Sequence, residues 1–275
     1  MRSPHSSALH IATEGLSACG KSTIQAFIAE GLNELKKPFL QISNGSLFRA
    51  LSYGEQQGMY QLTKDGPTNT LEKELGDLPA NTIRIASDGA VLLAGNRVQQ
   101  ELYTPEVAEG VFHLAKFPAV QEYVVTILRD SIVHLLEEGI TVINDGRSQK
   151  YSYLPHTPDV LIFVDRDFGS RVLGRTRQEY RKKMSNLLLP PNYLADCEDF
   201  WSLYNTQQQH IAERDLTDTT REKNPQFSKE KAILEGYNII DNNLPLNEVR
   251  ENVLGLIRQC VGINTTHPLP SMARR

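Results

Sequence analysis

The fold of this chain is decided by the stretch Gly15-Leu16-Ser17-Ala18-Cys19-Gly20-Lys21-Ser22. The stretch fits the pattern G-x-x-x-x-G-K-[ST] of a phosphate-binding P-loop. Glycines let the backbone approach an anion closely, so that successive N–H groups face its oxygens, and the next helix adds its positive N-terminal dipole. The pattern therefore predicts a site for the phosphates of a nucleoside triphosphate. The residues expected there are Gly15, Leu16, Ser17, Ala18, Cys19, Gly20, Lys21, Ser22 and Thr23.

The residues around this stretch support the prediction. The run Leu9–Thr13 is typical of a short buried strand, and apolar residues recur at helical spacing from Ile24 to Leu32. A P-loop requires strand, loop and helix in this order, which disfavours the alternative of a surface turn with a solvated lysine. Within the loop, we expect Lys21 to reach the outer phosphates and the Ser22 hydroxyl to bind Mg²⁺.

Composition places the chain among globular proteins and excludes several classes of function. Of its 275 residues, 40% are apolar and 23% are charged, and the net charge of -4 gives no general attraction to nucleic acid or anionic membranes. Three widely spaced cysteines argue against a disulfide framework or a zinc site. No apolar run approaches the roughly 20 residues of a membrane span, and Met1–Ala8 lacks the apolar core of a signal peptide. We expect a cytoplasmic monomer that binds small molecules, and neither nucleic acid nor membranes.

Five short β-rich runs alternate with helical patterns, an order typical of parallel strands joined by crossover helices. The third and fourth runs are almost wholly apolar, as expected for central strands that are covered on both faces. We predict an α/β fold, a three-layer sandwich with a five-stranded parallel sheet flanked by helices. The runs are 9–13, 39–42, 140–143, 160–164 and 237–240, and a long helix is expected at about 118–138.

Two segments interrupt this alternation within what we expect to be a single domain, 1–275. Between about 61 and 117, glycines and prolines separate short runs such as Thr82–Ile85 and Ala90–Leu93, which predicts a small β insert. From about 166 to 235 the chain is polar and begins with many basic residues, which predicts a helical excursion over the sheet. The last residues, 264–275, are expected to form a disordered tail.

Ligands of an open parallel sheet bind beyond the carboxyl ends of its strands. The second strand is followed by Ser43–Arg49, and the third by Asp145-Gly146-Arg147. Asp145 is placed to hold Mg²⁺ directly or through water, with a turn cap as the alternative. Arg49 and Arg147 are expected to converge on a second phosphate, because a guanidinium pairs two oxygens at once. Taken singly, each arginine is more often part of a surface ion pair.

Arginines also gather in the polar excursion. Arg214, Asp218 and Arg221 lie four and three residues apart and would share one face of a helix. Such a face is either an ordinary salt-bridge surface or a lid whose arginines neutralise a transferring phosphoryl group and exclude water. The same two interpretations apply to Arg171 and Arg175.

Together these stretches resemble the cytidylate kinase family of nucleoside monophosphate kinases, in order and over nearly the whole chain. Each match beyond the P-loop is weak alone, and their shared order carries the resemblance. The similar stretches are Ile11–Thr23, Asn44–Ala50, Thr104–Val107, Phe117–Val120, Asp145–Arg147 with Leu154-Pro155, and Arg214–Pro225.

The resemblance implies transfer of the γ-phosphoryl group of ATP to a nucleoside monophosphate, most simply CMP or dCMP, with Mg²⁺ as cofactor. It also implies a P-loop kinase fold in which 61–117 forms the monophosphate-binding insert and 166–222 the lid. The catalytic residues would be Lys21, Asp145, Arg147 and Arg221, with Arg171, Arg175 and Arg214 in the lid. The acceptor would be bound by Asn44, Gly45, Arg49, Gln121, Arg147, Ser148, Asp218 and Arg221.

Three positions depart from the family pattern at the base of the acceptor. The family's base-reading serine, arginine and second aspartate correspond here to Phe112, Gln121 and Ser148. Gln121 and Ser148 still carry groups that form hydrogen bonds, whereas the Phe112 side chain does not. A kinase with another nucleotide, nucleoside or small metabolite as acceptor therefore remains an alternative. A nucleotide-binding regulatory module without turnover is a second one, and it is disfavoured by the presence of Lys21 and Asp145.

Overall fold

The computed structural model describes residues 8–63, 68–79, 82–147, 149–152, 155–185, 198–220 and 225–262. Two predicted site residues, Ser148 and Arg221, lie outside the described residues, as does the predicted tail 264–275. The chain forms two compact units. Unit 1 contains Met1–Ala12 and Leu32–Val160, and unit 2 contains Thr13–Gly31 and Leu161–Arg275.

The predicted five-stranded parallel sheet is confirmed, with the strand order β2-β6-β1-β7-β8. Each strand begins within one residue of the start of the run that predicts it and ends within two residues of its end. The first strand, β1, is buried at all five of its residues, in agreement with its central place in the sheet. The strands are β1 (His10–Glu14), β2 (Phe39–Ser43), β6 (Thr141–Asp145), β7 (Val160–Asp165) and β8 (Asn238–Asp241).

In unit 1 the register of two strands determines which residues meet at the edge of the sheet. β2 and β6 pair in parallel, with Ser43 opposite Asp145. The two segments that follow, one beginning at Asn44 and the other at Gly146, therefore start side by side. The sequence analysis selected both segments because they follow strands.

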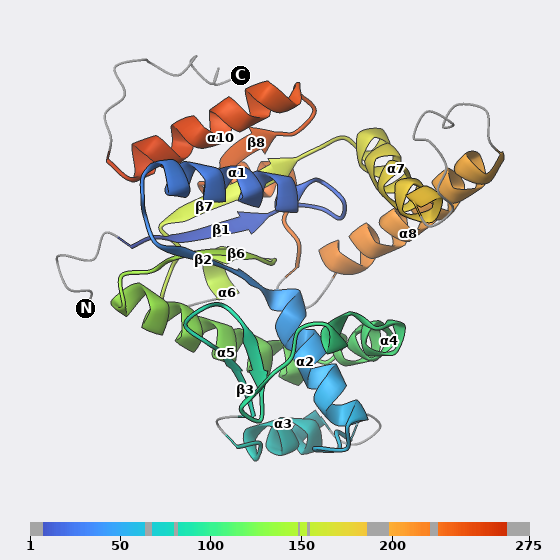
Figure 1. Cartoon of the computed structure of the whole chain (residues 1–275). Helices are drawn as coiled ribbons and strands as arrows, with labels where there is room; N and C mark the ends of the chain where they lie inside the picture. Colours follow the sequence, from blue (N-terminus) through green and yellow to red (C-terminus); the bar gives the residue numbers. More distant parts are fainter. Residues whose placement is uncertain are drawn as a thin grey trace. The chain divides into compact units, whose positions relative to one another are not determined.

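The insert of unit 1 is a three-stranded antiparallel sheet with short helices (Figure 1). Two of its strands, β3 (Ile83–Ile85) and β4 (Val91–Leu93), agree with the predicted β insert, whereas β5 (Asn96–Arg97) has only two residues and was not predicted. The predicted long helix is present as α5 (Pro118–Glu137). The remaining helices of this unit are α2 (Asn44–Gln56), α3 (Thr68–Gly76), η1 (Glu101–Tyr103), α4 (Pro105–Leu114) and α6 (Gln149–Ser152).

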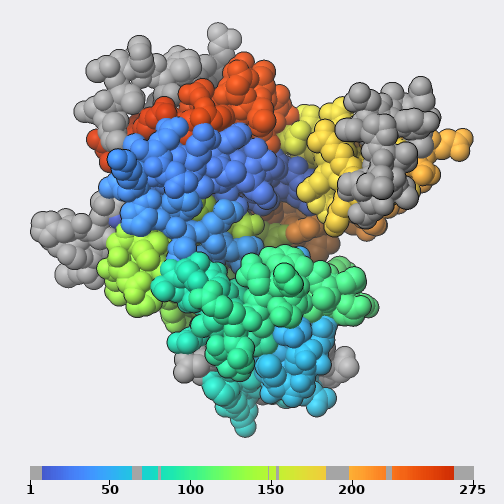
Figure 2. Space-filling model, viewed as in Figure 1, coloured from blue at the N-terminus to red at the C-terminus, as the bar shows by residue number. Residues whose placement is uncertain are grey.

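Helices α2 and α4 are joined by polar contacts as well as by packing. The Ser52 hydroxyl of α2 donates to the carbonyl oxygen of Val107 at 3.1 Å, and the Gln56 amide donates to that of Glu106 at 2.9 Å. Gly110 of α4 permits this approach, because a Cβ there would lie 2.1 Å from the Ser52 oxygen. Figure 2 shows α2 in light blue and parts of the insert in teal to green at the surface of unit 1.

In unit 2, helices pack on the strands that border the P-loop. α1 (Lys21–Glu34) packs against α10 (Leu246–Cys260) at Gly31, whose added Cβ would lie 3.1 Å from Leu254. The predicted helical excursion is present as α7 (Phe168–Ser185), α8 (Glu198–Thr219) and α9 (Lys229–Leu234). α7 and α8 pack lengthwise on each other (Figure 1), and the ring of Tyr180 meets that of Phe200 edge to face. Among the described residues, no helix is both long enough and apolar enough to cross a membrane.

Candidate active site

The loop between β1 and α1 has a backbone shape that glycines permit. Gly15 and Gly20 have φ angles of 148° and 98°, and Ala18 adopts the left-handed region with φ of 58°. L residues with a side chain rarely adopt such angles, so the loop concentrates unusual backbone where a bound anion is expected. Lys21 and Ser22 then open α1, whose first N–H groups have no partner within the helix.

Neighbouring strands hold the loop in this shape. A Cβ on Gly15 would lie 2.5 Å from the carbonyl oxygen of Val164, near the end of β7. After β8, the side-chain amide of Asn242 donates to the carbonyl oxygen of Cys19 at 2.7 Å and lies against Gly20. The sequence analysis missed Asn242, although it directly follows a strand and so met the criterion used for the first three strands.

The Lys21 ammonium group lies over its own loop. It donates to the carbonyl oxygens of Gly15 at 2.7 Å and Leu16 at 3.1 Å. These two carbonyl oxygens accept hydrogen bonds from the ammonium group and keep it close to the N–H groups of the loop. A phosphate that enters the loop would offer the same ammonium charged oxygens, which form stronger hydrogen bonds than neutral carbonyls do.

Two residues of the predicted lid contact the P-loop backbone within unit 2. The Asp215 carboxylate of α8 accepts a hydrogen bond from the N–H of Ser17 at 3.1 Å. Arg171 of α7 donates to the Ser17 carbonyl oxygen at 2.9 Å and pairs with Asp215 at 2.6 Å. The Arg171 side chain is only 4% exposed, and its Nε is a buried atom without a hydrogen-bond partner. The lid helices and the loop are thus linked through one arginine and one aspartate.

The other predicted lid residues form contacts on their own helices. Arg175 is exposed and pairs with Glu179 at 2.9 Å, one turn further along α7. Arg214 and Asp218 approach each other across one turn of α8, at 3.8 Å. This is the geometry of the ordinary salt-bridge face that the sequence analysis gave as one alternative. Asp218 is nevertheless nearly buried, and its carbonyl oxygen accepts from the N–H of Gln226 at 2.8 Å.

A buried carboxylate ends β1, directly before the P-loop. Glu14 is fully buried and accepts hydrogen bonds from the Gln226 amide at 3.0 Å, the Phe227 N–H at 3.2 Å and the Tyr237 hydroxyl at 2.7 Å. The bonds tie the start of the loop to the segment that follows the lid. Sequence reasoning missed this network because nothing local to Glu14 reveals partners more than 200 positions away.

The fourth strand of the sheet also ends in a carboxylate, and this one is neutralised. Lys229, the first residue of α9, donates to Asp165 at 2.5 Å, and this hydrogen bond raises the pKa of Lys229. The carbonyl oxygen of Asp165 accepts from the Asn242 N–H at 2.8 Å, next to the amide that holds the P-loop. Asp165 therefore helps to position Asn242, which in turn holds the P-loop.

In unit 1, the two predicted acceptor segments meet. A Cβ on Gly146 would lie 2.7 Å from the side-chain nitrogen of Asn44, so the loop after β6 passes directly against the first residue of α2. Asp145 and Arg147 flank that glycine and are both half-buried. The segments that follow β2 and β6 are thus in contact at Asn44 and Gly146. The convergence of Arg49 and Arg147 on one phosphate stays a prediction.

Arg49 lies on α2 and is held by the segment before α4. Its Nη1 donates to the Leu102 carbonyl oxygen at 3.2 Å, and its guanidinium carbon lies 4.8 Å from the centre of the Tyr103 ring. One hydrogen bond and one ring contact leave other donors of the five-donor guanidinium group for an anion. Tyr103 itself is exposed and was not predicted as a site residue.

Comparisons with known proteins bear on both units. The sequence model of the cytidylate kinase family matches residues 11–190. The chain belongs to the cytidylate kinase family. It is 30% identical to the cytidylate kinase of Caldicellulosiruptor saccharolyticus over 257 residues, which cover 92% of this chain and 97% of that enzyme. It is 28% identical to the cytidylate kinase of Bacillus subtilis over 255 residues, covering 91% and 97% of the two chains. This cytidylate kinase family member is therefore a nucleotide-binding phosphotransferase.

The predicted base-reading positions of this family member differ in their surroundings. Gln121 is buried near the start of α5, and its amide donates to the carbonyl oxygen of Ala115 at 2.8 Å. Phe112 is 65% exposed on α4, and the Lys116 ammonium lies 4.1 Å from the centre of its ring. One donor of Gln121 is thus committed to its own helix junction, while Phe112 presents an exposed aromatic face.

The two residues predicted to hold Mg²⁺ both carry oxygens, the ligands that this ion prefers. Ser22, exposed at the start of α1, lies in unit 2, and Asp145, half-buried at the end of β6, lies in unit 1. Among the described residues, no three His, Cys, Asp or Glu side chains gather into a metal site. The assignment of Mg²⁺ to Ser22 and Asp145 stays a prediction.

Proposed function

We propose that this chain transfers the γ-phosphoryl group of ATP to a nucleoside monophosphate, with CMP and dCMP as the first candidates. The observation that carries the proposal is the loop Gly15–Ser22, whose unusual φ angles and P-loop sequence support phosphate binding in a member of the cytidylate kinase family. The contact between Asn44 and Gly146 supports a second phosphate site, because it joins the two segments that resemble the family's acceptor site.

Each candidate residue has one role in this proposal. Lys21 and the N–H groups of the loop bind the outer phosphates of ATP, and Arg49 and Arg147 bind the phosphate of the acceptor. Arg221 and Asp218 act on the transferring group and the acceptor from the lid, 166–222, while 61–117 binds the monophosphate. Arg171, Arg175 and Arg214 order the lid. Catalysis then consists of positioning and charge neutralisation rather than covalent chemistry by the protein.

Ser22 and Asp145 are the residues that would hold Mg²⁺. When bound, the ion neutralises the charge that spreads over the phosphate oxygens during transfer. The protein residues keep their own tasks: Lys21 orients the donor, and Arg147 orients the acceptor for in-line attack. We also propose that the enzyme acts as a cytoplasmic monomer.

A second acceptor class is favoured by one observation. Because the Gln121 amide is already bonded to Ala115, it offers fewer donors to a base than the arginine usual at this position. Ser148, which takes the place of the family's second aspartate, cannot accept two hydrogen bonds in the same plane as a carboxylate does. A kinase of UMP or of another small phosphate acceptor is therefore the second candidate.

One assay separates these proposals. Purified protein with Mg-ATP is incubated with a panel of nucleoside monophosphates and nucleosides, and ADP release is measured against a reaction without acceptor. Release with CMP or dCMP alone supports the first proposal, and release with another acceptor supports the second. ATP binding without release for any acceptor would favour the regulatory module and contradict both.

Two variants make the assay specific for the proposed site. Lys21→Ala should lower kcat by at least a hundredfold, because a charge aimed at the transferring phosphate is lost, while Lys73→Ala, an exposed lysine of α3, should not change it. The double variant Gln121→Arg and Ser148→Asp should raise the ratio of CMP to UMP turnover. An unchanged ratio would mean that these two positions do not read the base.

A further inference from the structure

Four side chains in unit 1 form a continuous chain of hydrogen bonds beneath the acceptor loop. His156 Nε2 lies 3.1 Å from His10 Nδ1, and His10 Nε2 lies 2.7 Å from the Asn144 amide oxygen. The Asn144 amide nitrogen donates to the side-chain oxygen of Gln149 at 3.0 Å. His10, Asn144 and Gln149 are all fully buried, so water does not replace a bond that is lost.

The side-chain oxygen of Asn144 sets the direction in which these hydrogen bonds are donated. The Asn144 oxygen only accepts, so His10 donates through Nε2. In the tautomer of His10 that carries its single proton on Nε2, Nδ1 accepts from the Nε2–H of His156. Each member thus donates to the next, from His156 through His10 and Asn144 to Gln149. The two imidazole rings also stack, with an angle of 15° between their planes.

This series of hydrogen bonds ends at Gln149, which packs against Gly146 of the acceptor loop. The side-chain nitrogen of Gln149 would lie 1.8 Å from a Cβ on Gly146, so the amide packs where only a glycine leaves room. Turning this amide over would place its oxygen against Gly146 and its nitrogen against the Asn144 donor. The hydrogen bond from Asn144 therefore fixes which atom of Gln149 supports the loop.

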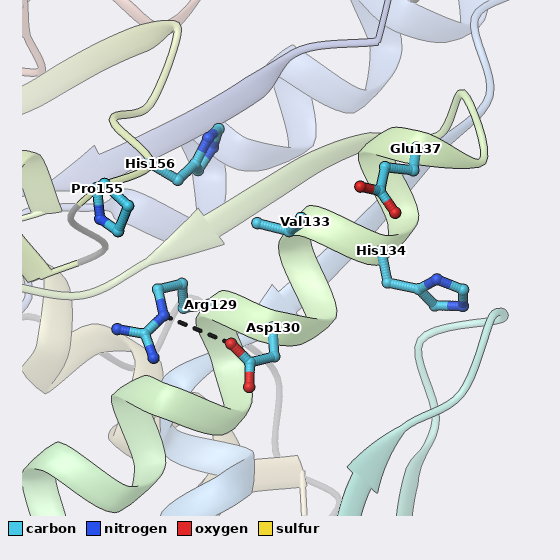
Figure 3. Close-up of a pocket in the computed structure, with 7 residues that line it drawn as sticks. All are labelled: Arg129, Asp130, Val133, His134, Glu137, Pro155 and His156. Atoms are coloured by element: carbon cyan, nitrogen blue, oxygen red, sulfur yellow. Dashed lines mark hydrogen bonds and ion pairs between the residues drawn. The ribbon is translucent and has the colours of Figure 1, made fainter. Parts of the chain in front are cut away.

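His156, at the other end of this series of hydrogen bonds, lies at the protein surface. His156 lines a pocket of about 360 Å³, where the segment containing Pro155 faces α5 (Figure 3). The pocket's α5 side is formed by Arg129, Asp130, Val133, His134 and Glu137. The sequence analysis assigned no role to His10, His156, Asn144 or Gln149, and the predicted catalytic set does not include them.

We propose that Gln149 is a positioning residue for the acceptor loop Asp145–Arg147, and that His156, His10 and Asn144 hold its amide in the working orientation. The proposal deepens the assignment of this loop to the acceptor phosphate and rests on it. Gln149 acts through Gly146, on which the placement of the flanking Asp145 and Arg147 depends. Loss of Gln149 should therefore weaken acceptor use and leave the ATP loop of unit 2 unaffected.

The test compares Gln149→Leu and Gln149→Glu with the wild type. Gln149→Glu keeps an oxygen for Asn144 but replaces the nitrogen at Gly146 with a second oxygen. Both variants should raise the KM for CMP about tenfold, equivalent to about 1.4 kcal/mol, with the KM for ATP changed less than twofold. In the free protein, amide hydrogen exchange of 143–147 should become faster in both.

A milder pair of variants covers the case in which a core substitution prevents folding. His156→Phe keeps a stacking ring but removes the donor to His10, and His156→Gln keeps an N–H donor. The phenylalanine variant should raise the KM for CMP and speed exchange at 143–147, and the glutamine variant should restore much of both. A matched control is Gln25→Leu, because Gln25 is a buried glutamine in unit 2 that donates to Thr13 at 3.0 Å.

The outcomes distinguish this inference from the proposed function. Unchanged exchange and unchanged KM for CMP in Gln149→Leu, or equal effects in Gln25→Leu, would overturn the positioning role. Faster exchange at 143–147 in a protein whose wild type phosphorylates no monophosphate would support the positioning role and overturn the assignment of the loop to an acceptor. Faster exchange together with the selective change in KM supports both.

Discussion

At the residue scale, Gly20 combines two demands that no other residue type meets. Its φ of 98° lies in the left-handed region, and a Cβ there would approach the Asn242 nitrogen to 2.2 Å. The same nitrogen donates to the Cys19 carbonyl oxygen, so a side chain at Gly20 would break a bond that shapes the P-loop. Gly20 thus contributes both a backbone angle and an open space.

We predict that Gly20→Ala abolishes the stabilisation of the protein by ATP. The matched control is Gly236→Ala, because Gly236 has a φ of 83° with no atom near its would-be Cβ. Both variants should lose about 1–2 kcal/mol of unfolding free energy from backbone strain, but only Gly20→Ala should also lose the shift in melting temperature with Mg-ATP. Equal ATP shifts in the two variants would contradict the role given to Asn242.

Some residues of the candidate site can be predicted from short sequence motifs, and others are known only from contacts between distant parts of the sequence. Lys21, Arg49 and Asp145 belong to short motifs that follow strands, so the sequence alone selects them. Asn242 directly follows β8 and could have been selected by the same criterion, whereas no spacing within the sequence reports the contact of Gln149 with Gly146. Motifs and strand ends therefore predict the residues proposed to bind phosphate better than those that hold the motifs in place.

At the element scale, the start of α7 depends on one carboxylate. Asp167 directly precedes the helix and accepts a hydrogen bond from the Ser170 N–H at 2.8 Å, which satisfies one of the free donors of the first turn. Hydrogen bonds from the side chain and backbone of Ser170 lower the pKa of Asp167 below 3.8. The cap therefore stabilises the folded protein most when Asp167 is ionised.

We predict that the effect of this cap depends on pH with a definite sign. A lowered pKa gives stability that is complete above the unfolded value of 3.8 and is lost as pH falls through the lower folded value. Urea unfolding should therefore show Asp167→Ala less stable than wild type at pH 6, with a difference that shrinks below about pH 3.8. The control Asp167→Asn keeps an acceptor without titrating, so its own cap should not respond to pH. A constant difference across this range for Asp167→Ala would contradict the prediction.

The end of β1 offers a second prediction at this scale. Glu14 accepts three hydrogen bonds, so Glu14→Leu would leave the donors of Gln226, Phe227 and Tyr237 without this acceptor. Tyr237→Phe removes one of these bonds and should cost about 1–3 kcal/mol in urea unfolding. Glu14→Leu should cost more, because three buried donors lose their acceptor. A smaller loss for Glu14→Leu than for Tyr237→Phe would contradict the role given to this network.

The elements differ in how well the sequence predicts them. The five strands of the large sheet lie at short β-rich runs and were all predicted. The signal is plainest for β6 and β7, whose runs are almost wholly apolar, because central parallel strands need no polar face. The short β5 and the helix α3 were not predicted, since neither carries a long periodic pattern. α4 was also missed, although its start has a clear signal: the Thr104 hydroxyl caps the Val107 N–H, and Pro105 follows it.

At the scale of the whole molecule, the two halves of the proposed reaction belong to different units. The P-loop and the lid helices lie in unit 2, and Arg49 with the loop Asp145–Arg147 lies in unit 1. β1 passes from one unit to the other, since the boundary falls after Ala12. With this division, ATP would stabilise unit 2 and the acceptor would stabilise unit 1. A single mutation should therefore weaken the binding of one ligand without weakening the binding of the other.

We predict that ATP and CMP each raise the melting temperature, and that single variants remove one shift without the other. A ligand at one hundred times its Kd adds about 2.7 kcal/mol, which corresponds to roughly 5–10 °C for a chain of this size. Lys21→Ala should lose most of the ATP shift and keep the CMP shift, whereas Arg49→Ala should do the reverse. This follows because, within the described part of the chain, Lys21 bonds to the P-loop and Arg49 to the Leu102–Tyr103 segment, and these segments lie in different units. Scanning calorimetry of both variants with each ligand measures the four shifts, and loss of both shifts in either variant would mean that the two sites do not form independently.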